Sequence, residues 1–220
     1  LEFLKKSQPF ILLRHDVDFS LENALTIAEL ESKMGIKSTF FIMLKTDFYN
    51  IFSKENSNNI KKILKFGHKI GLHFDCSAYK ENISNYELSK LCQKEKKILE
   101  NWFNTSVDII SFHRPNKNIL SGNPKVSYPT EHTYISKYTK KIKYFSDSRG
   151  RWKFGHPLDS LEFKKRRPIQ LLTHPIWWRS KPTSSFNTLE DFVDSKNRKM
   201  KYLLSQNVDF YNFNYFKNKI

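Results

Sequence analysis

Short, unbroken apolar runs alternate with helical patterns along most of this 220-residue chain. Five runs predict strands that are buried on both faces, at residues 10–13, 38–43, 69–74, 108–112 and 169–172. Three patterns with helical spacing lie between them, at residues 21–34, 60–66 and 84–103. This alternation predicts an α/β fold with a parallel sheet, as a barrel or a sandwich. The length favours a single domain over residues 1–220, in which the irregular region 116–168 forms long loops.

The tetrapeptide His15-Asp16-Val17-Asp18 closely follows the first predicted strand. Asp16 and Asp18 are two residues apart, so an extended backbone would point both carboxylates to the same side. The alternative interpretation is that one aspartate caps the helix that begins near Ser20. We favour a functional site, because a cap needs one carboxylate and this segment offers two carboxylates and an imidazole.

Groups that can bind a metal ion or transfer a proton follow four of the five predicted strands. They are Asp16 and Asp18, His73 and Asp75, His113, and His174. Parallel strands bring their carboxyl ends to one side of a fold, so these residues should converge on one cavity. Imidazole nitrogens with a carboxylate suit Zn²⁺ or a similar divalent metal ion, and they leave positions open for water and substrate. The pattern therefore predicts metal-assisted hydrolysis.

Four segments carry a resemblance to a known family. They are Asp16-Val17-Asp18, Gly67-His68-Lys69-Ile70-Gly71-Leu72-His73, Phe112-His113-Arg114-Pro115 and Leu171-Leu172-Thr173-His174-Pro175. These segments resemble the motifs of the polysaccharide deacetylase family (NodB homology, carbohydrate esterase family 4), in a branch whose first motif is Asp-x-Asp. The resemblance spans roughly residues 10–178. It implies a single distorted (β/α) barrel of about seven strands.

The resemblance also implies the roles of individual residues. Asp16 matches the catalytic base, His174 matches the catalytic acid, and Arg114 matches an arginine that orients the base. Asp18 and His73 match metal ligands. The implied cofactor is a divalent metal ion, with Zn²⁺ as our first expectation.

One position departs from the family pattern. The family has a further metal-binding histidine four residues after the first, and here that position is Ser77, a poor ligand. Either Asp75 or His113 could complete the ligand set. We favour His113, because it preserves two histidines and one carboxylate, and Asp75 would then accept a hydrogen bond from the ring of a ligand histidine. The remaining alternative is a catalytically inactive protein that binds carbohydrate without a metal ion.

Aromatic side chains near these motifs suit a sugar substrate. Trp177 and Trp178 follow the last motif, and Trp152 follows Asp147, which lies where the family has an aspartate that tunes the catalytic acid. We expect these tryptophans to line the mouth of the cavity, with ordinary core packing as the alternative. The expected reaction removes an acyl group, an N-acetyl group first and an O-acyl group as the alternative, from a sugar or a polysaccharide.

The formal net charge of +16 raises the question of a nucleic-acid partner. We expect no specific one, because most lysines are scattered and no nucleic-acid-binding motif occurs. Two local clusters, Lys140-Lys141-Ile142-Lys143 and Lys164-Lys165-Arg166-Arg167, are interpreted as solvated faces. The positive charge would instead attract an anionic substrate, such as an acidic glycan or a nucleotide-linked sugar.

The sequence contains no apolar stretch near the roughly 18 residues of a membrane span, and its first residues lack the apolar core of a signal peptide. We therefore expect no membrane span and a cytoplasmic location. The expected location is provisional, because the sequence begins at Leu1 and not at a methionine. Cys76 and Cys92 are too few for a disulfide framework or a four-cysteine zinc site, and we expect free thiols.

Overall fold

The computed structural model describes residues 9–80, 83–179, 181 and 183–211. The chain divides into two compact units, Leu1–Trp178 and Arg179–Ile220. The second unit contains one long helix, α7 (Ser185–Asn207), which begins after Ser184. None of the helices in the described residues combines the length and the apolar content that a bilayer span requires.

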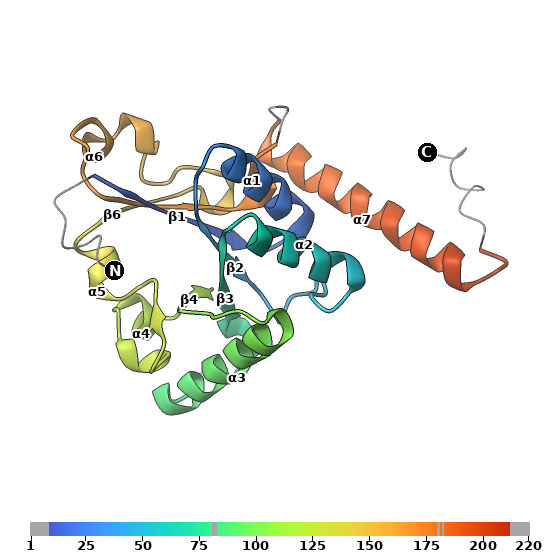
Figure 1. The fold of residues 1–220 in the computed structure, drawn as a ribbon, viewed down its shortest axis with the longest axis horizontal. Helices are drawn as coiled ribbons and strands as arrows, with labels where there is room; N and C mark the ends of the chain where they lie inside the picture. The colour runs from blue at the N-terminus through green and yellow to red at the C-terminus, as the bar shows by residue number, and fades with distance from the viewer. Residues whose placement is uncertain (1–8, 81–82, 180, 182, 212–220) are drawn as a thin grey trace. The chain divides into compact units, whose positions relative to one another are not determined.

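The first unit is built on a sheet of seven parallel strands. In chain order they are β1 (Ile11–Val17), β2 (Thr39–Ile42), β3 (Lys69–Asp75), β4 (Ile109–His113), β5 (Glu131–His132), β6 (Lys143–Ser146) and β7 (Ile169–Thr173). Their spatial order is β5-β4-β3-β2-β1-β7-β6, so β1 lies between β2 and β7. The sheet curls into a half-barrel (Figure 1), which confirms the predicted distorted (β/α) barrel of about seven strands.

A contact between two distant strands shows how strongly the sheet curls. Strands β1 and β4 are three positions apart in the sheet, which would separate them by about 14 Å if it were flat. Yet the Ser111 hydroxyl on β4 lies 3.0 Å from the Asp16 carboxylate on β1. The curl therefore brings side chains of non-neighbouring strands together on the inner face.

Three long helices pack on the outer face of the sheet: α1 (Leu21–Lys33), α2 (Lys54–Lys65) and α3 (Asn85–Phe103). The hydroxyls of Ser20, Ser53 and Ser84 cap them, each accepting a hydrogen bond from a backbone N–H three residues further on. The remaining elements of this unit are one turn long. They are η2 (Cys76–Ala78), α4 (Lys117–Leu120), η3 (Pro124–Val126), α5 (Ser136–Thr139), η4 (Ser148–Gly150), η5 (Pro157–Asp159), α6 (Leu161–Lys164) and η6 (Pro175–Trp177).

The two-residue period of the strands separates the core from the inner face. On β3, Ile70, Leu72 and Phe74 belong to the apolar core beneath the helices. The alternate residues Gly71 and His73 face inward. A Cβ atom on Gly71 would lie 2.6 Å from the Phe41 ring, so only glycine leaves room for that ring beside His73.

Several predicted boundaries differ from the structure. The first strand was expected over 10–13 but continues to Val17, which pairs with Ile42, because Arg14 and Asp16 neutralise each other inside the sheet. The second helix was expected to begin at residue 60 but begins at Lys54, since polar residues fill its first turns and Ser53 caps it. The predicted loop region 116–168 contains β5 and β6, which have two and four residues and are too short for a period to be read.

Candidate metal centre and acid–base site

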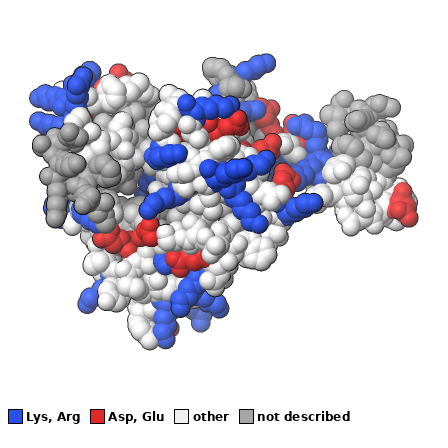
Figure 2. All heavy atoms as spheres, viewed as in Figure 1, with Lys and Arg blue, Asp and Glu red and all other residues white. Residues whose placement is uncertain are grey.

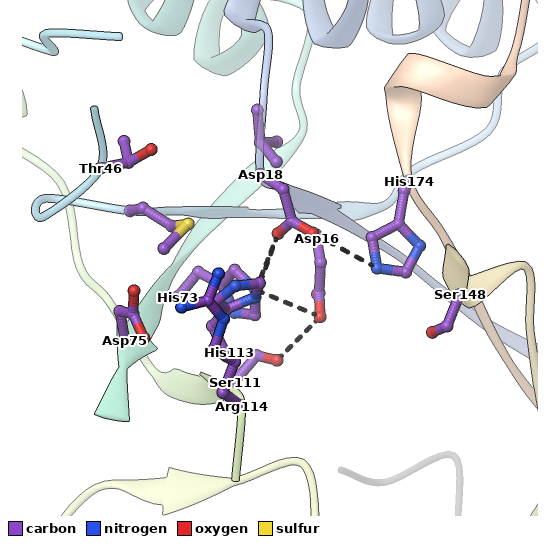
Figure 3. Close-up of polar contacts among 12 residues, drawn as sticks. Asp16, Asp18, Thr46, His73, Asp75, Ser111, His113, Arg114, Ser148 and His174 are labelled. Carbon is purple, nitrogen blue, oxygen red and sulfur yellow. Dashed lines mark hydrogen bonds and ion pairs between the residues drawn. The ribbon is translucent and has the colours of Figure 1, made fainter. Parts of the chain in front are cut away.

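The carboxyl ends of β1, β3, β4 and β7 meet around a cavity of about 1030 Å³. Asp16, Asp18, His73, His113 and His174 all line it (Figure 3). These five side chains were predicted to converge together with Asp75, which lines the cavity as well, and the structure brings all six together. Their convergence follows from parallel pairing, which places the ends of these strands at one edge of the sheet.

Asp18, His73 and His113 form a cluster with the geometry of a metal site. One ligand atom from each lies within 4.8 Å of the others. Asp18 Oδ1 lies 3.1 Å from His73 Nε2 and 3.6 Å from His113 Nδ1. This oxygen is buried between the two ring nitrogens, an arrangement that suits a cation between the three side chains. One carboxylate and two imidazoles are a donor set suited to Zn²⁺ or a similar divalent ion.

The protonation of this cluster is set by burial and by its own charges. Burial lowers the pKa of His113, which favours the neutral imidazole that a metal ligand must be. Burial also acts to lower the pKa of His73, but the carboxylates of Asp16 and Asp18 outweigh it and raise that pKa above its usual value. These two carboxylates favour the protonated form of His73, and a bound cation would replace that proton.

Ser77 occupies the position where the family has its additional histidine, and it takes part in a different set of contacts. Its backbone N–H and its hydroxyl both donate to Asp75 Oδ1, at 2.9 and 2.8 Å. The Ser77 hydroxyl also accepts a hydrogen bond from Arg114 Nη1 at 3.1 Å. Asp75 therefore binds Ser77, while the Nδ1 atom of His73 has no hydrogen-bond partner among the described residues.

Asp16 is held by two donors on one oxygen. Arg14 Nη2 and the Ser111 hydroxyl each donate to Asp16 Oδ2 at 3.0 Å. The other oxygen, Oδ1, is buried and accepts no hydrogen bond from the described residues. Burial acts to raise the pKa of Asp16, but the positive charge of Arg14 and the neighbouring His73 outweigh it and hold the pKa below its usual value. Asp16 is thus an ionised carboxylate with one oxygen available to accept a proton.

The arginine that contacts Asp16 is Arg14, whereas the resemblance implied that it would be Arg114. Arg14 is buried, and it contacts Asp16, Ser111 and Gln170 across the inner face of the sheet. Arg114 also lines the cavity, but its guanidinium donates to Ser77. Arg14 was not predicted from the sequence, although a charged residue two positions before Asp16 in a buried strand must face the same side and be paired.

His174 forms the other side of the site. Its Nδ1 lies 2.6 Å from Asp147 Oδ1, and its backbone N–H donates to the same carboxylate. Its Nε2 points into the site, 3.8 Å from Asp18 Oδ2. Burial acts to lower the pKa of His174, but the hydrogen bond to Asp147 and the carboxylate of Asp18 outweigh it and raise the pKa. His174 is therefore held in one orientation and favours its protonated form.

His15 belongs to the opposite face of the sheet. Its Nδ1 contacts the Thr173 hydroxyl at 2.7 Å and its Nε2 contacts Glu31 Oε1 at 2.9 Å, beneath α1. Helix α1 is capped by Ser20, so neither Asp16 nor Asp18 serves as its cap. The two carboxylates thus remain in the cavity, and the histidine beside them does not.

The predicted aromatic lining is present in part. Trp177 lines the cavity, with its ring centroid 6.5 Å from that of Phe19. Trp178 is half-exposed and donates from its indole N–H to Asp147 Oδ2 at 2.8 Å, so it orients the partner of His174. Trp152 packs edge-on against His156 and is not among the residues that line the cavity.

Comparisons with known proteins establish the fold of this site. No protein-family model matches the sequence, and no curated protein matches it. One similar structure is a mutant of a CE4 family pseudoenzyme from Bacillus anthracis, in which enzymatic activity is restored. It matches this chain with a TM-score of 0.50 and 17% sequence identity, over 88% of this chain and 64% of that one. The peptidoglycan deacetylase PdaC from Bacillus subtilis has a TM-score of 0.50 and 14% identity, over 91% of this chain and 98% of that one.

The chain therefore has the NodB-like fold of the CE4 (carbohydrate esterase family 4) proteins, which confirms the resemblance found in the motifs. It spans less than two thirds of the length of the first of these structures. At these identities the likeness concerns the fold, and the chemistry must be argued from the side chains.

Metal binding can be measured directly on protein that has been stripped of metal. We expect one Zn²⁺ per chain by isothermal titration calorimetry, and His113→Ala should lower the affinity by more than about 10-fold, because it removes a direct ligand. His156→Ala is the matched control, because His156 contacts Trp152 outside the cluster. Unchanged affinity in His113→Ala, together with lost affinity in Asp75→Asn, would contradict this ligand set and favour Asp75.

Proposed function

We propose that the protein is a metal-dependent hydrolase that removes an acyl group, in the first place an N-acetyl group, from a sugar or a polysaccharide. The observation that supports this proposal is the convergence of a metal-type cluster, a free carboxylate oxygen and an oriented histidine on one cavity. The NodB-like fold, which the chain shares with a peptidoglycan deacetylase, agrees with it.

In this proposal Asp18, His73 and His113 would hold the metal ion. A divalent ion in that position supplies a Lewis acid that acidifies water and polarises an acyl carbonyl. Asp16 accepts the proton of the attacking water on its Oδ1 atom, while Arg14 and Ser111 fix its Oδ2.

His174 completes the reaction on the opposite side of the cavity. Its Nε2 donates a proton to the departing amine as the carbon–nitrogen bond breaks, which leaves a free amine and a carboxylate as products. Asp147 stabilises the protonated ring and fixes its orientation through Nδ1. The two proton-transfer groups thus act from different strands, Asp16 from β1 and His174 after β7.

Replacement of the proposed base gives the most direct test of the reaction. Asp16→Asn should lower kcat by about 100- to 10,000-fold on an N-acetylated oligosaccharide, while the Zn²⁺ content remains that of the wild type. Acetate release and elemental analysis measure the two quantities. Near-normal activity in Asp16→Asn would exclude the proposed reaction path.

The position of Arg14 predicts that it orients the base. Arg14→Lys keeps a positive charge but has no planar fork to reach both Gln170 through one nitrogen and Asp16 through the other, so kcat should fall by about 100-fold with little change in KM. Arg114→Lys is the matched control and should retain most of the wild-type kcat. The opposite ranking of the two variants would show that Arg114 has the orienting function.

The substrate of this reaction is proposed to carry an anionic group. Lys45, Arg114 and Arg149 line the cavity, and in the described part of the chain none of them lies within 4.0 Å of a carboxylate. Asp47 and Asp75 also line the cavity, and neither has a cation within that distance among the described residues. Three cations without a carboxylate partner against two such acids leave a positive excess, which favours a negatively charged substrate.

This charge preference predicts a salt effect. KM for a hyaluronan tetrasaccharide, which carries carboxylates, should rise as sodium chloride is added, because salt screens exposed charges. KM for chitotetraose, which has N-acetyl groups and no charge, should change little. Equal salt responses for the two oligosaccharides would contradict the charge preference and leave the proposed hydrolysis intact.

A second candidate function is carbohydrate binding without catalysis. Ser77 in place of the family histidine favours it, and one structure with this fold is a mutant of a pseudoenzyme. A wild-type protein that binds chitotetraose, takes up no Zn²⁺ and releases no acetate would support this candidate over the hydrolase.

A further inference from the structure

The two basic clusters of the sequence lie side by side in the fold. Lys143 begins β6 and pairs with Ile169 at the start of β7, so the segments before these two strands are neighbours. A shallow pocket brings them together: Lys140, Lys141, Lys143 and Arg167 all line it. Figure 2 shows Lys and Arg side chains gathered at the upper left, over α6.

These cations are not neutralised by neighbouring acids. In the described part of the chain, no carboxylate lies within 4.0 Å of any of the seven: Lys140, Lys141, Lys143, Lys164, Lys165, Arg166 and Arg167. Glu162 lines the same pocket, and Asp159 lies nearby in the sequence. Seven cations beside two acids leave a strongly positive surface.

Large apolar side chains are exposed within the same region. Their exposed fractions are 42% for Phe163, 54% for Leu158, 59% for Phe154 and 63% for Leu161. Leu158 and Phe163 share a second pocket with Lys164, Arg166 and Arg167, while Phe154 lines the first pocket with Arg167. We call the seven cations and these four apolar residues the basic–apolar face.

The basic–apolar face is separate from the catalytic cavity. It lies around the amino ends of β6 and β7, where Lys143 and Ile169 begin these strands. Asp147 and His174 follow the carboxyl ends of the same strands. The face and the cavity are therefore on opposite edges of the sheet.

We propose that the basic–apolar face binds the surface of a membrane that contains anionic lipids. Lysine and arginine near a bilayer are attracted to acidic headgroups, and exposed leucine and phenylalanine can enter the boundary between headgroups and acyl chains. A nucleic acid would satisfy the cations but would leave Leu158 and Leu161 without an apolar environment. In the bound orientation the catalytic cavity faces away from the bilayer, toward substrates above it.

The test is co-sedimentation with vesicles of phosphatidylcholine, with and without phosphatidylglycerol. Wild-type protein should bind the anionic vesicles and not the neutral ones. The triple variant Lys141→Gln, Lys164→Gln, Lys165→Gln should weaken binding by about 100-fold, because each cation near the surface contributes about fivefold. The matched control Lys61→Gln, Lys65→Gln, Lys97→Gln removes the same charge from exposed positions on α2 and α3 and should bind like the wild type.

The apolar part of the proposal has its own variant. Leu161→Ser with Phe163→Ser changes exposed residues of the short helix α6 and should weaken vesicle binding while binding to duplex DNA is unaffected. Circular dichroism checks that each variant is folded. The proposal would be overturned if the wild type did not bind anionic vesicles, or if the two triple lysine variants lost binding equally. It would also be overturned if the wild type bound duplex DNA more tightly than anionic vesicles, measured by the concentration of DNA that displaces the protein from them.

Discussion

The ion pair between Arg14 and Asp16 is buried on the inner face of the sheet, and its surroundings come from several strands. Arg14 also contacts Gln170 on β7, lies over the Phe41 ring of β2, and shares Ser111 on β4 with Asp16. Removing one partner from a buried pair leaves an uncompensated charge that costs several kcal/mol. The curled sheet supplies these partners, because a flat sheet would hold β1 and β4 apart.

The same ion pair links the fold to the proposed chemistry. It fixes one oxygen of Asp16 and leaves the other without a hydrogen bond from the described residues, and that oxygen is the base in the proposed reaction. The two-residue period then places Asp18 beside it, within reach of His73 and His113. His15, one position from Asp16, faces α1 instead. Local strand geometry thus decides which charged residues of one tetrapeptide belong to the site.

The sequence allowed the fold class and most of the site to be predicted, because both depend on short-range patterns. Buried apolar runs indicated five strands, and motif spacing indicated His73 and His174. Strands β5 and β6 escaped notice because two and four residues carry no readable period, and α7 was not predicted although Ser184 caps it. The contact of Arg14 with Ser111 joins residues 97 positions apart and depends on sheet curvature, which no local pattern reveals.

In the proposed site, Asp18, His73 and His113 hold one divalent metal ion between the proposed base and the proposed acid. A crystal structure of the zinc-loaded protein, with data collected on both sides of the zinc absorption edge, would show whether they do. We expect one strong anomalous peak about 2.0–2.2 Å from one atom of each of these three side chains, with Asp16 and His174 outside the ligand set. A peak bound instead by Asp75, or no peak in this cavity, would contradict it.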